Sequence, residues 1–348
     1  MSGGRPDPLP EPDLAPYEAL PKAELHIHLE GAIPLDTLGE LIRKYGGDPS
    51  VSDRRSLESR FTYRDFPHFI DTWVWKNGFL REAEDFTHIA EGAARDLAAR
   101  NVRYGEVIFS PSDFFRHGLD TGTITEAIRI GLARVKEIEV ALVADLVRDR
   151  GPENGTRILR ELAELKEYGV VGITIGGSEH EFPPEPFAGV FEEARRGGFR
   201  TSAHAGEAAG PESVWGAVRA LRVDRIGHGT RAAEDDALVD HLAAEGIPVE
   251  LCPLSNVRTG VVPSIADHPA RRFYDRGIPV SVSTDDPKMF QTSLPLEYAL
   301  LARDLGFTPP EIGRVVLGAL RSSWLPDDRK LLMEKEFTSN PAWAPFRS

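Results

Sequence analysis

The residues with the clearest capacity for chemistry are histidines and acids at the ends of short apolar stretches. His26 and His28 flank Ile27, and alternation along a strand would put both imidazoles on one face. One such pair alone is more often a packing or surface feature. Three later stretches end in matching groups, which are His204 in HAGE, His228 in RIGH, and Asp285 with Asp286 in STDDP. The whole set predicts a mononuclear site of nitrogen and oxygen ligands, which suits zinc and a bound water whose pKa falls toward roughly 7.

For two further residues of reactive type, a chemical role depends on the residues around them. Glu207 stands three residues after His204, close enough to donate a proton in the site without being a ligand. Taken alone, it would be read as a surface glutamate. Cys252 lies in the apolar segment ELCPLSN, where a packed and inert thiol is expected.

Eight β-rich runs separated by helical patterns would position these groups. The predicted strands are Glu24–His28, Arg103–Phe109, Val140–Val147, Val170–Ile175, Thr201–His204, Arg225–His228, Val249–Cys252 and Val280–Thr284. Helical patterns between them include 82–99, 156–165, 187–196 and 233–244. This alternation predicts a (β/α)8 TIM barrel, in which catalytic residues stand at the carboxyl ends of strands. An open doubly wound sheet would alternate similarly, but no G-x-G-x-x-G follows the first strand.

Two segments depart from the alternation. Residues 1–18 are proline-rich with few apolar residues, which predicts a disordered arm preceding a single barrel domain over 19–348. An aromatic-rich stretch, Ser56–Phe79, follows the first strand and predicts a helical insertion. Insertions after barrel strands lie on the catalytic face. The stretch could therefore be a lid over the site, or helices that only pack on the barrel.

Composition limits the partners of the chain. It has 348 residues and a net charge of −14, which disfavours nucleic acid and anionic membranes and favours a small molecule. The single cysteine, Cys252, excludes an intrachain disulfide and fits the cytoplasm. No apolar run approaches the roughly 20 residues of a membrane span, and the first residues do not resemble a secretory signal. The sequence leaves the oligomeric state open.

The motifs HIHLEGA, HAGE, RIGHGT, CPLSN and STDDP, in this order and spacing, resemble the adenosine deaminase family of the amidohydrolase superfamily. The resemblance runs from about Leu20 to Leu332 and implies hydrolytic removal of a purine 6-amino group. It implies one Zn2+ per chain with the ligands His26, His28, His204 and Asp285. It further implies Glu207 as the acid that protonates purine N1 and His228 as the base that orients water. Asp286 would meet N7, and Gly177 would meet N3 through its backbone amide.

Two departures from the family pattern concern the substrate. Glu30 follows the H-x-H-x motif, where adenosine-specific members usually carry an aspartate that meets the ribose 5′-hydroxyl. Glutamate is one methylene longer, so Glu30 is expected to line the substrate pocket and to crowd or re-aim its 5′ end. In GITIGGSE, Thr174 and Ser178 stand where adenosine enzymes have acids. HAGEAAGPESVW resembles a subgroup that includes deaminases of 5′-modified adenosines such as 6-amino-6-deoxyfutalosine, a menaquinone precursor. The candidates for contacts at the 5′ end are Arg64, Trp73, Trp75 and Lys76.

Three other functions compete with deamination of adenosine or a 5′-modified adenosine. The first is deamination of free adenine, because adenine-specific relatives resemble this chain at Glu30 and at CPLSN. The second is a two-metal amidohydrolase, which would need a bridging lysine near the fourth strand, where VVGITIGG has none. The third is a binding protein without turnover, although loss of activity usually removes a ligand or the acid.

Overall fold

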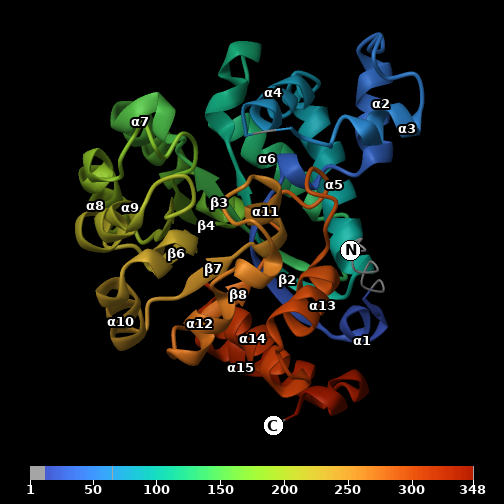
Figure 1. Cartoon of the computed structure of the whole chain (residues 1–348). Coiled ribbons are helices and arrows are strands. Elements are labelled where there is room, and N and C mark those ends of the chain that lie inside the picture. The colour runs from blue at the N-terminus through green and yellow to red at the C-terminus, as the bar shows by residue number, and fades with distance from the viewer. Residues whose placement is uncertain (1–11, 65, 348) are drawn as a thin grey trace, which may run out of the picture.

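Eight parallel strands form the centre of the molecule (Figure 1). The computed structural model describes residues 12–64 and 66–347. The strands are hydrogen-bonded in chain order. They are β1 (Lys22–His28), β2 (Val102–Phe109), β3 (Glu139–Asp145), β4 (Val170–Thr174), β5 (Arg200–Ala205), β6 (Arg225–His228), β7 (Val249–Leu251) and β8 (Val280–Val282). Each lies within or overlaps a predicted strand, and the predicted (β/α)8 barrel is confirmed.

The barrel closes through backbone hydrogen bonds between β1 and the residues after β8. His28 N donates to Asp285 O at 2.8 Å, and Asp285 N donates to His26 O at 3.0 Å. Helix α14 (Pro309–Ser322) packs against both β8 and β1 and so covers this seam. The backbone of Asp285 therefore joins the last strand to the first, directly beside the histidines of β1.

Helices connect the strands and cover the outside of the barrel (Figure 1). Between β1 and β2 lie α2 (Leu35–Lys44), α3 (Arg54–Ser59), α4 (Phe66–Asn77) and α5 (Ala83–Ala99). The next connections carry α6 (Thr121–Leu132), α7 (Gly151–Ala163), α8 (Ala188–Arg196), α9 (Pro211–Gly216), α10 (Asp236–Glu245), α11 (Pro253–Arg258) and α12 (Ala270–Asp275). After β8 follow α13 (Leu294–Leu305), α14 and α15 (Asp327–Ser339).

Capping side chains and prolines near the first turn determine where several helices begin. Asp120 accepts a hydrogen bond from Thr123 N at 2.7 Å and so caps α6. Before α14, Thr308 and Glu311 form a reciprocal capping box, and Pro309 occupies the first turn, where its missing N–H costs nothing. These signals set where the connecting helices begin and hence how the loops at the strand ends run.

The predicted N-terminal arm falls partly outside the described residues, which begin at residue 12. Within its described part, α1 (Ala15–Ala19) forms a short helix. The Tyr17 ring packs edge-on against Phe346 with centroids 5.9 Å apart, and α1 also contacts α13. The described residues of the predicted arm therefore pack against the rest of the barrel domain. Among the described residues, no helix is long and apolar enough to cross a membrane.

Candidate metal centre and active site

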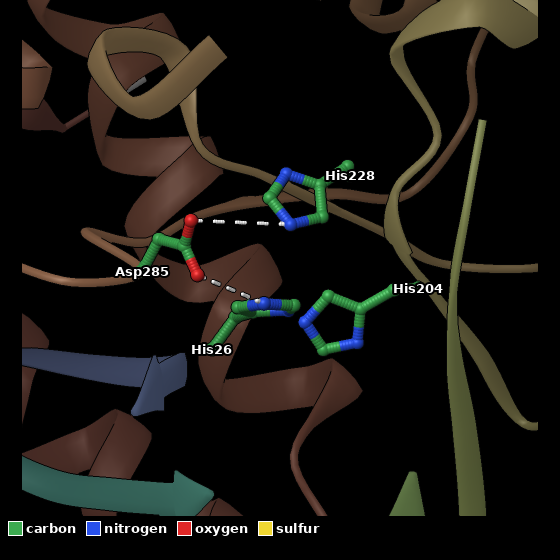
Figure 2. A group of neighbouring side chains, drawn as sticks. All are labelled: His26, His204, His228 and Asp285. Carbon is green, nitrogen blue, oxygen red and sulfur yellow. Dashed lines mark ion pairs between the residues drawn. The ribbon is translucent and has the colours of Figure 1, made fainter. Parts of the chain in front are cut away.

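Four strands deliver the predicted metal-binding groups to one point. His26 and His28 end β1, His204 lies in β5, His228 ends β6, and Asp285 follows β8. Ligand atoms of His26, His204, His228 and Asp285 all lie within 4.8 Å of one another, and Figure 2 shows these four side chains converging. All are buried. Side chains that are more than 250 residues apart in the sequence thus meet at the carboxyl ends of the strands.

His28 belongs to the same centre. Its Nε2 lies 3.1 Å from Nε2 of His204 and 3.4 Å from Oδ1 of Asp285. His26 Nε2 is also 3.4 Å from that oxygen, whereas His228 Nε2 lies 4.0 Å from the other oxygen, Oδ2. Four imidazoles therefore surround one carboxylate, with His26 and His28 beside Oδ1 and His228 beside Oδ2.

Burial keeps three of these four histidine rings neutral, so each has a nitrogen with a lone pair. It lowers the pKa of His28 to about 4 and of His228 to about 3, and it holds the pKa of His204 well below its usual range. A neutral imidazole is the form that binds a metal ion. His26 Nε2 is buried without a hydrogen-bond partner among the described residues, although it faces the centre. Nitrogen donors, one carboxylate and this orphaned nitrogen fit a metal cofactor.

Hydrogen bonds behind the centre hold its side chains in place. His26 Nδ1 donates to Glu250 Oε2 at 2.8 Å, which turns Nε2 toward the centre. The other oxygen of Glu250 pairs with the buried Arg225, which also pairs with Glu106 across the barrel interior. Asp285 Oδ2 accepts from Ser255 Oγ at 2.7 Å. Glu250 was not predicted as a site residue, although a charged residue within an apolar strand is a signal for a buried partner.

Several residues around the predicted metal centre have strained backbone conformations. Among the described residues, six other than glycine have positive φ, and three of them line the central cavity: His228 (60°), Asp285 (60°) and Val147 (49°). Such conformations disfavour residues with a Cβ and persist where surrounding structure enforces them. Here the hydrogen bonds that close the barrel hold Asp285 in this conformation.

A loop after β5 carries Glu207. The carboxylate of Glu179 accepts hydrogen bonds from four successive backbone amides of this loop, Gly206 to Ala209, at 2.6–3.0 Å. Glu207 Oε2 then lies 3.5 Å from His228 Nε2. Burial raises the pKa of Glu207 to about 8, and the charges of Asp285 and Glu179 act in the same direction. The carboxyl group is therefore mostly protonated at neutral pH, as a proton donor requires. Glu179, like Glu250, was not predicted as a site residue.

Asp286 faces the cavity next to the centre. Its Oδ1 is buried and has no hydrogen-bond partner among the described residues. Burial and the adjacent charge of Asp285 raise its pKa well above the usual range, so it can hold a proton for a ligand acceptor. A Cβ at Gly31 would come within 1.8 Å of Oδ1, so only glycine fits there in HIHLEGA. Asp286 thus presents an unused polar group beside the predicted metal ligands.

One cavity of about 300 Å³ contains these groups. His28, His204, Glu207, His228, Asp285 and Asp286 line its inner end, with Gly177 at one wall. Gly177 has φ of +102°, and a Cβ there would meet Asp149 Oδ2 at 2.0 Å, so the wall depends on a glycine. Phe69, Ile70, Trp73 and Val74 of α4 line the outer end, together with Phe290 and Arg150. The aromatic-rich insertion is thus part of the cavity wall.

The predicted contacts at the outer end are mostly elsewhere. Trp73 lines the cavity, with its ring edge-on to His28. Trp75 points away and donates from Nε1 to Asp48 Oδ2 at 2.9 Å. Lys76 is buried under the Trp73 ring and donates to Glu30 O at 2.6 Å. Arg64 is exposed and outside the cavity lining. Trp75, Lys76 and Arg64 are therefore not cavity residues in this structure.

Glu30 also lies outside the cavity lining, contrary to the expectation that it would crowd the pocket. It is in a 3-10 turn, Glu30–Ala32, directly after β1, and its side chain is fully buried. Its Oε1 accepts from Ser110 N at 3.0 Å. The turn directs the carboxyl group behind the wall, where it supports Ser110, which does line the cavity. Glu30 therefore contacts the pocket only indirectly, through Ser110.

Comparisons with known proteins agree over nearly the whole chain. Residues 21–339 match the model of the family described as adenosine deaminase. The chain is 35% identical to an aminodeoxyfutalosine deaminase of Streptomyces coelicolor, over 93% of this chain and 85% of that protein. It is 36% identical to an adenine deaminase of Rhizobium leguminosarum, over 91% of this chain and 98% of that protein.

Solved structures give the same result. An adenine deaminase from Arthrobacter aurescens superposes with a TM-score of 0.87 at 30% identity, over 92% of this chain and 98% of that chain. An amidohydrolase from Burkholderia ambifaria, solved with bound zinc, gives a TM-score of 0.85 at 29% identity, over 93% of this chain and 91% of that chain. A related amidohydrolase with this fold therefore binds zinc.

Proposed function

The chain belongs to the adenosine deaminase family and is a hydrolytic deaminase acting on carbon–nitrogen bonds of cyclic amidines, and we propose that its substrate is adenosine or a 5′-modified adenosine. The reaction would replace the purine 6-amino group by oxygen and release ammonia. The observation that carries this proposal is the meeting of Glu207, His228 and Asp286 with the predicted metal ligands in one cavity.

We assign the metal ligands to His26, His28, His204 and Asp285 and the metal to zinc. The donor set is typical of mononuclear zinc sites, and the zinc-bound relative supports the choice of metal. When bound, the ion would supply an activated water at neutral pH. The role of the surrounding side chains is to place the purine and to move protons around C6.

The inner end of the cavity offers a group for each polar edge of a purine. Glu207, protonated at neutral pH, donates its proton to N1 and makes C6 more electrophilic. Asp286, which also holds a proton, donates a hydrogen bond to N7, and the backbone amide of Gly177 donates to N3. His228 orients the attacking water. Addition of water at C6 gives a tetrahedral carbon, which loses ammonia and leaves the 6-oxo product.

The outer end favours a substrate that is larger than a free base. Ile70 and Val74 of α4 line the cavity and remain 40% and 50% exposed, so apolar surface is available to a substituent. Arg150, 3.6 Å from Asp113, is the one lysine or arginine among the described residues of the lining. It is a candidate to pair with an anionic group on the 5′ substituent, in place of Arg64 and Lys76.

Free adenine is the second candidate. The sequence identities to an aminodeoxyfutalosine deaminase and to adenine deaminases are nearly equal. The test is ammonia release by the zinc-loaded protein from adenine, adenosine and 6-amino-6-deoxyfutalosine, compared by kcat/KM. We expect the 5′-modified nucleoside to be preferred and adenine to be poorest. If adenine is the best substrate, the outer end of the cavity does not favour substrates that carry a ribose, and the nucleoside proposal is wrong.

A further inference from the structure

A chain of hydrogen bonds behind His228 begins at a backbone amide that lies outside the site. Ala270 N, in the first turn of α12, donates to His268 Nδ1 at 3.2 Å. A backbone amide can only donate, so Nδ1 of His268 is an acceptor. His268 is buried, which lowers its pKa to about 3 and keeps the ring neutral. A neutral imidazole carries a single proton, which in His268 must therefore be on Nε2.

The next member of the chain is Asn256, which is fully buried within α11. His268 Nε2 lies 3.2 Å from Asn256 Oδ1, and Thr230 Oγ1 donates to the same oxygen at 2.7 Å. Two donors at Oδ1 determine which end of the amide is oxygen and which is nitrogen. The amide nitrogen, Nδ2, is then directed at His228 Nδ1, 3.2 Å away.

The direction of this last bond determines where the proton of His228 lies. Asn256 Nδ2 can only donate, so His228 Nδ1 accepts and the proton of the neutral ring is on Nε2. Nε2 is the nitrogen that faces the site, 3.5 Å from Glu207 Oε2. His228 thus presents an N–H group to the cavity instead of a lone pair.

We propose that Asn256 and His268 are positioning residues that hold His228 in the Nε2–H tautomer, so that His228 donates a hydrogen bond to the attacking oxygen and does not accept its proton. The inference deepens the proposed function and rests on it for the identity of the reaction. It also excludes Nε2 of His228 as a metal ligand, which leaves the fourth position to His28. The proton that the oxygen loses then goes to Glu207, which has already given its own proton to N1.

The first test reads the tautomer without substrate. In zinc-loaded protein labelled with 15N-histidine, long-range proton–nitrogen spectra distinguish a ring N–H from a nitrogen with a lone pair. The His228 signals are identified by their loss in His228→Gln. We expect the proton on Nε2 and a lone pair on Nδ1. A proton on Nδ1, or an Nε2 that carries no proton, overturns the proposal. Failure of the proposed substrate would leave this result unaffected.

The second test inverts the last hydrogen bond. Asn256→Asp replaces the donor by a carboxylate, which can only accept, so His228 Nδ1 should gain a proton. Zinc content and KM should stay close to wild type, while kcat falls by about 10²–10⁴-fold, the range for lost acid–base function or a wrong tautomer. Wild-type kcat in this variant overturns the proposal. The control is Asn340→Asp at the C-terminal end, where Asn340 caps Ala342 N at 2.9 Å and aspartate caps equally well.

Two variants at His268 test the same chain of hydrogen bonds if Asn256→Asp does not fold. His268→Gln keeps an N–H group for Asn256 Oδ1, whereas His268→Leu removes it. We expect near wild-type kcat for the glutamine variant and a loss of about 10-fold for the leucine variant, as one hydrogen bond warrants. Equal kcat values in the two variants would count against the chain of hydrogen bonds.

Discussion

The two ends of the cavity are built in different ways. At the inner end, strand residues are fixed by buried hydrogen bonds: Glu250 holds His26, Ser255 holds Asp285, and Asn256 holds His228. At the outer end, Ile70 and Val74 stand on a helix inserted between β1 and β2 and are half exposed. The difference indicates that the barrel strands hold the catalytic side chains in place. Substitutions in the inserted helix can therefore change which substrate binds without moving those side chains.

The largest effect is expected from removal of a metal ligand at the inner end. His26→Ala or Asp285→Ala should lose both the metal, about one ion per chain in the wild type, and detectable deamination. Metal analysis and ammonia release measure the two losses. His88→Ala removes an exposed histidine paired with Glu40 and should change neither. Full metal occupancy in both ligand variants would contradict the assignment.

Loss of the proton donor comes next. Glu207→Gln should retain the metal and bind purine, yet lose turnover by about 10²-fold or more, because an amide cannot protonate N1. Steady-state kinetics and ligand titration separate these two properties. Glu192→Gln, on the outer face of α8, is the matched control. Near-normal turnover in Glu207→Gln would remove Glu207 from the mechanism.

A weaker effect is expected one step behind the ligands. Glu250→Gln should lower metal affinity by about 10–100-fold, because the hydrogen bond that orients His26 is lost or weakened. Competition with a chelator measures this affinity. Glu297→Gln is the control, since burial raises the pKa of Glu297 to about 8 and the native group is already mostly neutral. Unchanged metal affinity in Glu250→Gln would show that His26 needs no such support.

Changes at the outer end should alter selectivity and leave the chemistry intact. Ile70→Ala combined with Val74→Ala should lower kcat/KM for a 5′-modified adenosine by about 10-fold through lost apolar contact, with little effect on adenosine. Ile130→Ala, an exposed isoleucine on α6, should affect neither substrate. Equal losses for both substrates would mean that α4 shapes the whole cavity and the two ends are not independent.

The smallest effect is expected from the tryptophan that points away from the cavity. Trp75→Phe loses the hydrogen bond to Asp48 and should lower the free energy of unfolding by about 1 kcal/mol, with kcat/KM unchanged for every substrate. Thermal or denaturant unfolding and kinetics measure the two quantities. A change of substrate selectivity in this variant would instead indicate that Trp75 contacts the 5′ end of the substrate.

The inner end was predictable from sequence because each of its groups follows a recognisable strand. His26, His204, His228 and Asp285 stand at strand ends, and parallel strands bring such ends together. Glu250, Glu179 and Asn256 were given no role because their partners lie far away in the chain. Asn256 ends CPLSN and Glu179 ends GITIGGSE, but neither motif shows which groups these side chains contact. The charge of Glu250 within an apolar strand was the one available signal.

The outer end was only partly predictable because the sequence does not show how a helix is rotated. On α4, Phe69, Ile70, Trp73 and Val74 share one face through their spacing of three and four residues, whereas Trp75 falls on another. The aromatic composition marked the helix as important but could not select the face. Glu30 was misplaced for a related reason, since the turn after β1 directs its side chain behind the wall.

The closure of the barrel at Asp285 has a consequence for the order in which the protein can be assembled. β1 is synthesised first and pairs with β2 on one edge, but the residues that pair with its other edge come about 260 positions later, as Thr284 N and Glu24 Oε1 do at 2.9 Å. Contacts over such separations form slowly and late in folding. A nascent chain that ends before Asp285 has an open barrel and an incomplete ligand set. Metal uptake and barrel closure should therefore coincide, so that an unfinished chain is unable to retain the ion.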